Sequence, residues 1–279
     1  MKNFLAVFDG YQLNESTLEY ALQISKKANA HLTGVFLDTF FYHNYNLSRV
    51  LNTASDPDAA MKELNEKEQS QRDESVYVFQ NVCEQAGVSY SIHRDTSVAL
   101  LELQYESMFA DLIIINEREK FTRSDNDHPS GFVKGLLADV QCPVLVVPDL
   151  FKEFEGMILL YDGSPSSLYA IKMFSYLFDQ WNTLPVEVLS VNESTIEVVS
   201  VPGSKMMKDF IEMHFSRPNF SLLNGKAEEE ILAHLEGVDK NKLVVLGAYR
   251  RSQFSRWFKQ SMADVLMKNL DLPLFITHH

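Results

Sequence analysis

Two Asp-Gly pairs are the residues of this 279-residue chain whose type and position first suggest chemistry. Asp9-Gly10 ends the run NFLAVFDG, and Asp162-Gly163 ends the run GMILLYDG, so each pair follows an apolar stretch of strand length. A carboxylate at the carboxyl end of a buried strand can accept hydrogen bonds from a ribose hydroxyl or a base amine, and the glycine permits a tight turn. The alternative is that each aspartate only starts the turn and caps the next helix.

A second candidate site begins at Gly247, where another apolar run ends. The segment GAYRRSQFSRWFKQS at 247–261 includes Arg250 and Arg251, and it places four of the second half's thirteen Lys and Arg residues within ten positions. Guanidinium groups match phosphate and carboxylate oxygens well, so Gly247, Arg250, Arg251 and Ser261 could form an anion site. The alternative is that the arginines extend into solvent.

The corresponding stretch of the first half lacks these features. Asn116 stands where the second half has Gly247, and no glycine follows until Gly131. Glu117 and Glu119 would repel a polyphosphate. We therefore expect this stretch to be a poor site for an anion.

The repeated Asp-Gly pairs indicate that the chain consists of two copies of one unit. The two Asp-Gly pairs lie 153 residues apart, and the runs CPVLVVPD at 142–149 and LPLFITHH at 272–279 repeat each other near the ends of the two halves. We predict two domains, 1–150 and 151–279. Compared with the second, the first carries about 23 extra residues within 38–87.

Each half alternates apolar strands with amphipathic helices, which is typical of a doubly wound α/β sheet of parallel strands. Runs such as 112–115 and 243–246 are apolar at every position and should be buried on both faces. In the first half the predicted strands lie near 3–8, 31–37, 88–93, 111–116 and 143–148, and the helices near 14–28, 57–86, 97–108 and 130–140. In the second half the strands lie near 156–161, 185–191, 219–223, 242–247 and 273–277, and the helices near 166–180, 204–215, 226–236 and 257–269.

The extra residues of the first half allow two interpretations. The charged stretch from 61 to 82 suits a lengthened, solvent-facing helix with a loop before it. Alternatively the segment is a lid or a partner surface, because Phe40, Phe41, Tyr42 and Tyr45 would be costly to leave exposed.

Composition excludes several classes of protein. The formal charge is −13, from 25 Lys and Arg against 38 Asp and Glu, which disfavours nucleic-acid binding. Two isolated cysteines, the absence of HxH or HExxH spacing and the lack of an apolar run of membrane-spanning length indicate neither a disulfide scaffold, a metal site nor a membrane segment. We expect a cytoplasmic protein that binds rather than catalyses, since no catalytic constellation is present.

Taken together, the motifs AVFDG, LLYDGS, VVLGAYRRSQFSRW, SMADVL and the two Pro-led final strands resemble the universal stress protein family in tandem form. The resemblance implies two five-stranded parallel α/β sandwiches of the adenine nucleotide alpha hydrolase-like type. It also implies that Asp162, Val191, Gly247 and Ser261 line a nucleotide crevice, and that Asp9 and Gly10 mark a degenerate site that does not bind ATP. Members that bind ATP carry Gly-x-x-Gly, nine residues and Gly-Ser or Gly-Thr, whereas this chain has Arg250 and Gln260 in place of the second and third glycines.

The resemblance leaves two functions open. The first is a stress-response module that binds a small anionic ligand or a protein partner. The alternative is a nucleotide-switched protein or weak ATPase that holds ATP and Mg²⁺ in the second domain only. The resemblance further implies that the last strands of the two halves pair within one chain as a pseudo-dimer, and a homodimer of whole chains stays open.

Overall fold

A computed structural model describes residues 1–10, 13–37, 56–95, 99–119, 127–193, 204–247 and 262–277. The chain divides into two compact units, Met1–Val140 and Gln141–His279, here called unit 1 and unit 2. Within the described residues, no helix is both long and apolar enough to cross a membrane.

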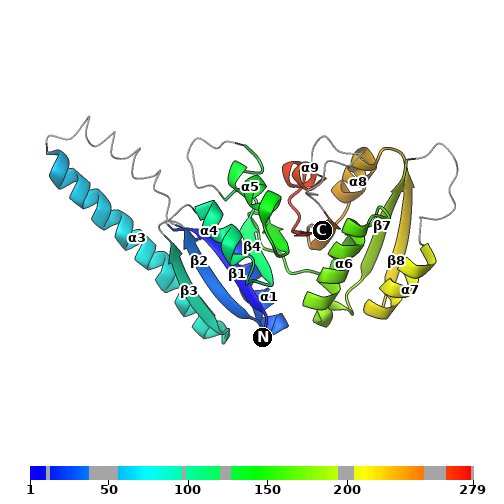
Figure 1. Cartoon of the computed structure of the whole chain (residues 1–279), viewed down its shortest axis with the longest axis horizontal. Coiled ribbons are helices and arrows are strands. Elements are labelled where there is room, and N and C mark those ends of the chain that lie inside the picture. Colours follow the sequence, from blue (N-terminus) through cyan, green and yellow to red (C-terminus); the bar gives the residue numbers. More distant parts are fainter. Residues whose placement is uncertain are drawn as a thin grey trace. The chain divides into compact units, whose positions relative to one another are not determined.

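Unit 1 is a parallel sheet in the strand order β3-β2-β1-β4, with its helices between the strands in sequence (Figure 1). Helices α4 and α5 lie side by side, as do α1 and α3. The elements are β1 (Asn3–Asp9), α1 (Glu15–Ala28), β2 (His31–Leu37), α3 (Pro57–Ala86), β3 (Tyr90–Asp95), α4 (Ala99–Glu106), β4 (Leu112–Asn116) and α5 (Gly131–Asp139).

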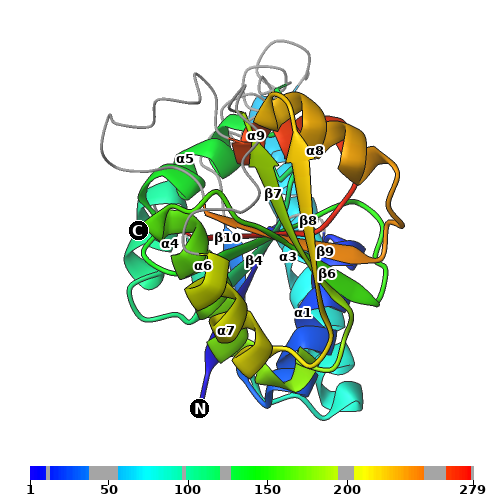
Figure 2. The same cartoon turned by 90° about the vertical axis from the view of Figure 1, so that its right-hand side faces the viewer.

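Unit 2 has the strand order β5-β10-β9-β6-β7-β8. Neighbouring helices again pair, α6 with α7 through the rings of Tyr176 and His214, and α8 with α9 (Figure 2). The elements are β5 (Val144–Val147), β6 (Gly156–Leu160), α6 (Pro165–Leu177), the short 3-10 helix η1 (Asp179–Trp181), β7 (Val186–Asn192), α7 (Ser204–His214), β8 (Pro218–Asn224), α8 (Ala227–Glu236), β9 (Lys242–Gly247), α9 (Met262–Asn269) and β10 (Leu274–Thr277).

One strand pairing in unit 2 is antiparallel. Strand β5 ends the first sequence repeat, and it pairs antiparallel with β10, which ends the second, so that Val146 lies opposite Leu274. The other described pairings in this unit are parallel. Because β5 pairs with β10, the division between units falls after Val140, ten residues before the boundary that the sequence suggested.

The α/β architecture of alternating strands and helices confirms the predicted fold class. Every residue of β4, β5 and β6 is buried, as expected of strands that are covered on both faces of the sheet. Helix ends follow local chemistry: the Asn14 side chain accepts a hydrogen bond from the Thr17 amide, and Asp56 does the same for Ala59 before Pro57.

Helix α3 accounts for much of the extra length of the first repeat. It spans 30 residues, as predicted, and ends at Gly87, whose φ of 67° is the left-handed conformation that glycine adopts without strain. Its carboxyl-terminal part is anchored by Phe79, whose ring contacts those of Phe8 and Phe36. A Cβ on Gly34 would lie 2.8 Å from the Phe79 ring, so this packing requires glycine there. The aromatic residues 40–45, and with them the lid interpretation, lie outside the described residues.

Candidate functional site

In unit 1, Glu119 lies beyond the carboxyl ends of β1 and β4. The backbone amide of Asp9 donates to Glu119 Oε1 at 3.2 Å, and the Ser130 hydroxyl donates to the Glu119 carbonyl at 2.5 Å. Glu119 is 8% exposed. Burial, together with the nearby Asp9 charge, raises the pKa of Glu119 to about 8, although the Asp9 amide bond opposes the shift. At neutral pH Glu119 is therefore mostly protonated, and it lies there as a neutral group.

Asn116 and Glu117 also lie at this edge of unit 1, at the end of β4. Asn116 is buried, and its Oδ1 accepts a hydrogen bond from the Arg118 amide at 2.8 Å. Buried Glu117 lies with Oε1 3.7 Å from His128 Nε2 and 3.8 Å from Arg118 Nε.

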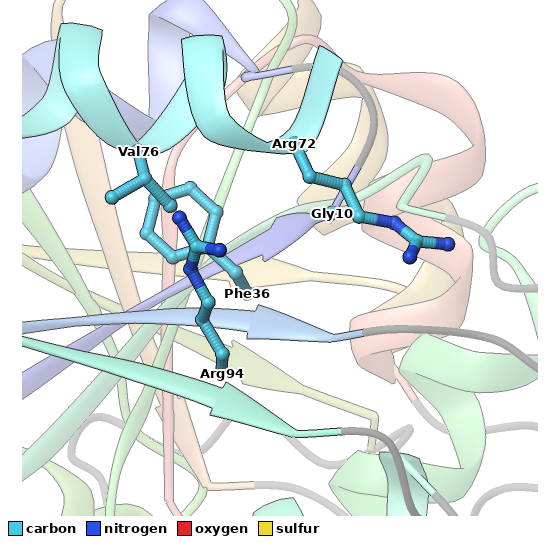
Figure 3. Close-up of a pocket in the computed structure, with 5 residues that line it drawn as sticks. All are labelled: Gly10, Phe36, Arg72, Val76 and Arg94. Atoms are coloured by element: carbon cyan, nitrogen blue, oxygen red, sulfur yellow. The ribbon is translucent and has the colours of Figure 1, made fainter. Parts of the chain in front are cut away.

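A small hollow lies next to Gly10, lined also by Phe36 of β2, Arg72 and Val76 of α3, and Arg94 of β3 (Figure 3). Its volume is about 20 Å³, which holds about one water molecule and no nucleotide base. The arginines are matched by acids: Arg94 Nη1 lies 2.8 Å from Asp73 Oδ1, and Arg72 Nη2 lies 4.0 Å from Glu68 Oε2. The hollow lined by these five residues is therefore too small for ATP.

In unit 2, Asp162 organises the turn from β6 into α6. Its Oδ1 accepts hydrogen bonds from the Ser164 amide at 2.9 Å and the Ser167 hydroxyl at 2.7 Å. Ser164 in turn caps the helix by accepting from the Ser167 amide. Burial raises the pKa of Asp162, but these hydrogen bonds outweigh it, so the pKa lies below its usual value and the exposed carboxylate is ionised at neutral pH. The capping role that the sequence allowed is present.

Gly163 and Val191 lie near Asp162 at the same edge of the sheet. Gly163 has a φ of 77°, so the turn needs a residue tolerant of the left-handed region. Val191 is half-buried in β7, two residues beyond Leu189, whose carbonyl accepts the Tyr161 amide. The structure thus brings three of the predicted site residues to one edge.

Gly247 lies against the first turn of α6. A Cβ there would be 2.5 Å from the Ser166 carbonyl oxygen and 2.6 Å from the Ser166 hydroxyl, so only glycine lets β9 and α6 approach so closely. Ser166 is 5% exposed, and its buried hydroxyl has no hydrogen-bond partner among the residues that the structure describes. Buried hydroxyls are normally paired, so this orphan beside Gly247 fits a polar ligand atom.

The remaining predicted residues of the anion site, Arg250, Arg251 and Ser261, lie outside the described residues, and their roles stay predictions. Among the residues that are described, no group of three or more His, Cys, Asp and Glu side chains is placed to hold a metal ion.

Sequence reasoning missed several polar residues at these edges. It did not identify Ser166 or Ser167, although serines in a first helical turn after Asp-Gly are a usable signal. It also missed Glu193, which follows β7 and whose Oε1 accepts the Ala227 amide at the start of α8, at 2.6 Å. Arg72 and Arg94 were not associated with the crevice, because their proximity depends on long-range packing.

Solved structures resemble the whole chain. A universal stress protein from Archaeoglobus fulgidus DSM 4304 matches with a TM-score of 0.70 and 16% identity, covering 99% of this chain and 98% of the other. A protein from Pseudomonas aeruginosa UCBPP-PA14 with a provisional universal stress protein name matches with a TM-score of 0.62 and 15% identity, over 100% and 93% of the two chains. A protein of unknown function from Pseudomonas aeruginosa PAO1 gives the same TM-score and identity, over 100% and 92%.

The sequence itself matches no protein-family model and no curated protein. The structural likeness nevertheless extends over both repeats. The chain therefore has the fold of the Archaeoglobus universal stress protein along its full length.

Proposed function

We propose that the chain is a tandem stress-response protein of the universal stress type that acts by binding and not by turnover, with its small-ligand site in unit 2. The observation that carries the proposal is the contrast between the corresponding sheet edges of the two units. In unit 1 the Glu119 carboxyl accepts the Asp9 amide, whereas in unit 2 Asp162 is exposed and the Ser166 hydroxyl beside Gly247 has no partner among the described residues.

The ligand class follows from the donors and charges at the unit 2 edge. Asp162 uses Oδ1 for its two described hydrogen bonds, so Oδ2 remains for a ribose hydroxyl or a base amine. The Ser166 hydroxyl offers a further hydrogen bond. Arg250 and Arg251 follow Gly247 in sequence and suit an anionic group. We therefore propose a small anionic ligand, and ATP is the first member of that class to test.

A thermal-shift titration of the whole chain tests this site. ATP with Mg²⁺, AMP and inorganic phosphate are the probes, because a ligand that binds only the folded state stabilises it by about 2.7 kcal/mol at a hundredfold excess over Kd. Asp162→Asn removes the charge but keeps an Oδ1 that can accept from Ser164 and Ser167. Asp9→Asn is the matched control in unit 1.

We expect a melting shift with at least one of these probes, lost in Asp162→Asn and kept in Asp9→Asn, and no phosphate release from ATP. Equal loss in both variants would contradict the assignment to unit 2. An unchanged melting temperature with all three probes would contradict the proposal of an anionic ligand. Steady ATP hydrolysis that Asp162→Asn abolishes would favour the weak ATPase instead.

The arrangement of the last strands also bears on the proposed function. The antiparallel pairing of β5 with β10 supports an internal pseudo-dimer, in which the final strands of the two repeats cover each other's edges. Two repeats in one chain could then diverge, one as the ligand-binding half and the other as a partner-binding half.

A further inference from the structure

Strand β8 is the last strand of the sheet in unit 2, and its outer edge is unpaired among the described residues (Figure 1). All seven residues of β8 pair with β7 on the other side. Phe220 and Leu222 are 38% and 36% exposed, and Asn219 and Asn224 are exposed as well. An unpaired edge of this length is a template on which a further strand can form.

The main-chain groups of β8 alternate between β7 and the open edge. The Gly225 amide, directly after β8, donates to the last carbonyl of β7 at 3.1 Å. Because successive residues of a strand direct their amides and carbonyls to opposite sides, the odd-numbered residues of β8 face β7 and the even-numbered ones face the open edge. Phe220, Leu222 and Asn224 therefore direct both groups outward. Pro218, which has no amide hydrogen, stands where no bond to β7 is lost.

The sequence of β8 lacks the charges that usually protect an edge strand. It reads PNFSLLN and contains no charged residue. Strand β3, at the edge of the sheet in unit 1, reads YSIHRD and carries Arg94 and Asp95. Charged side chains on an edge strand oppose pairing with another strand. Two β8 strands would instead pair without like charges opposite each other on the strands.

Antiparallel pairing of two β8 strands about a two-fold axis at Ser221 uses the whole edge. Phe220 then stands opposite Leu222 of the second copy, and the two residues exchange both of their main-chain hydrogen bonds. At each end the Asn224 amide can donate to the Pro218 carbonyl of the other copy. The side chains of Phe220 and Leu222 from both copies lie on one face, so they cover each other's exposed apolar surface.

Charged residues at the two ends of β8 are complementary in the same arrangement. Exposed Arg217 directly precedes the strand, and Gly225 directly follows it. The Glu230 side chain lies against Gly225, where a Cβ would collide with it. In the register about Ser221, Arg217 of one copy stands opposite Gly225 of the other and on the same face, and therefore beside Glu230. Neither charge belongs to the described ion pairs of this region, which are Lys226–Glu229 and His234–Glu187.

We propose that β8 pairs antiparallel with β8 of a second copy of the chain, so that two chains form a two-fold dimer through unit 2. A pair of seven-residue strands is small for a protein interface, so the expected Kd is on the order of micromolar. The dimer goes beyond the proposed ligand-binding role. Its experiments use no nucleotide, so its failure is distinguishable from failure of the ligand site.

Sedimentation velocity of the whole chain, over a concentration series through the micromolar range, tests the dimer. Arg217→Glu and Glu230→Arg each place like charges at both ends of the strand pair. A mixture of these two variants restores opposite charges at both ends, but only in a dimer that contains one copy of each. The matched control is Lys172→Glu, which reverses an exposed charge on α6.

We expect the wild-type chain to dimerise, with a Kd at least about tenfold higher in either β8 variant and unchanged in Lys172→Glu. The equimolar mixture of Arg217→Glu and Glu230→Arg should dimerise about as well as the wild type. A wild-type chain that stays monomeric, variants that dimerise as well as the wild type, or a mixture that associates no better than its components overturns the proposal.

Amide hydrogen exchange measured by NMR tests the edge itself. When the dimer predominates, the outward amides of Phe220, Leu222 and Asn224 should exchange at least about tenfold more slowly than in the monomer. The amides of Ser221 and Leu223 face β7 and should change less. Exchange of the three outward amides that is the same in monomer and dimer would place the contact elsewhere and overturn the proposal.

Discussion

Glu119→Gln is the sharpest test of how the unit 1 crevice is closed. The substitution keeps a carbonyl oxygen that can accept the Asp9 amide, and it removes the proton that titrates. Burial raises the pKa of Glu119 from 4.5 to about 8, so the folded state holds a proton that the unfolded state releases between these values. The contribution of Glu119 to the free energy of unfolding should therefore be greatest below pH 4.5 and should be lost as the pH rises to 8.

The size of the effect follows from the shift. Each pKa unit corresponds to about 1.4 kcal/mol, so a change from 4.5 to about 8 gives at most about 5 kcal/mol between the two ends of the range. Glu119→Gln should match the wild type near pH 4.5 and exceed it in stability by several kcal/mol above pH 8. Asp9→Asn should lower the pKa of Glu119, because the negative charge of Asp9 is the second cause, next to burial, that raises this pKa.

Two measurements check this prediction. Carbon-13 NMR of the glutamate carboxyls, with the Glu119 signal identified by its loss in Glu119→Gln, gives the pKa directly. Hydrogen exchange of β1 and β4 amides from pH 5 to 9, corrected for intrinsic rates, reports opening of unit 1 separately from unit 2. A Glu119 carboxyl that titrates near 4.5, or parallel pH profiles of variant and wild type, would refute the reasoning.

Three further substitutions test packing and capping by urea unfolding. Gly247→Ala should destabilise unit 2 by about 1–3 kcal/mol because its Cβ would meet the Ser166 carbonyl at 2.5 Å, whereas Gly237→Ala, with its nearest neighbour at 3.5 Å, should be near neutral; equal effects would argue against the close approach. Phe79→Ala should cost about 3–5 kcal/mol by emptying the ring cluster with Phe8 and Phe36, while Tyr77→Ala, at 64% exposure, should cost little; similar losses would mean that α3 is not anchored there. Asn14→Ala should cost about 1 kcal/mol through loss of the Thr17 cap, and Asn14→Ser should restore most of it; no recovery would place the effect elsewhere.

Much of the fold could be predicted because its signals are local. Asp56-Pro57 begins a helix and Gly87 ends it, so α3 was predicted at its observed bounds. Unbroken apolar runs located β4 and β9, since strands buried on both faces need no alternation.

The closed edge of unit 1 was harder to predict, because it depends on contacts between distant residues. In the sequence Asn116-Glu-Arg-Glu, Glu119 has the pattern of an exposed charge that repels phosphate. Its position against the Asp9 amide, 110 residues earlier in the chain, buries it and removes most of its charge. The hollow between α3 and β3 likewise pairs Arg94 with Asp73, 21 residues away. No local pattern encodes such pairings.

The pairing of β5 with β10 has an evolutionary consequence. A chain cut after residue 150 would carry β5 away and leave β10 with an open row of amides and carbonyls along one side. Separation of the two repeats into two chains would therefore expose a strand edge that favours aggregation, whereas substitutions outside β5 and β10 leave this pairing intact. The pairing of β5 with β10 therefore favours the retention of both repeats in one chain, while the residues at their sheet edges diverge independently.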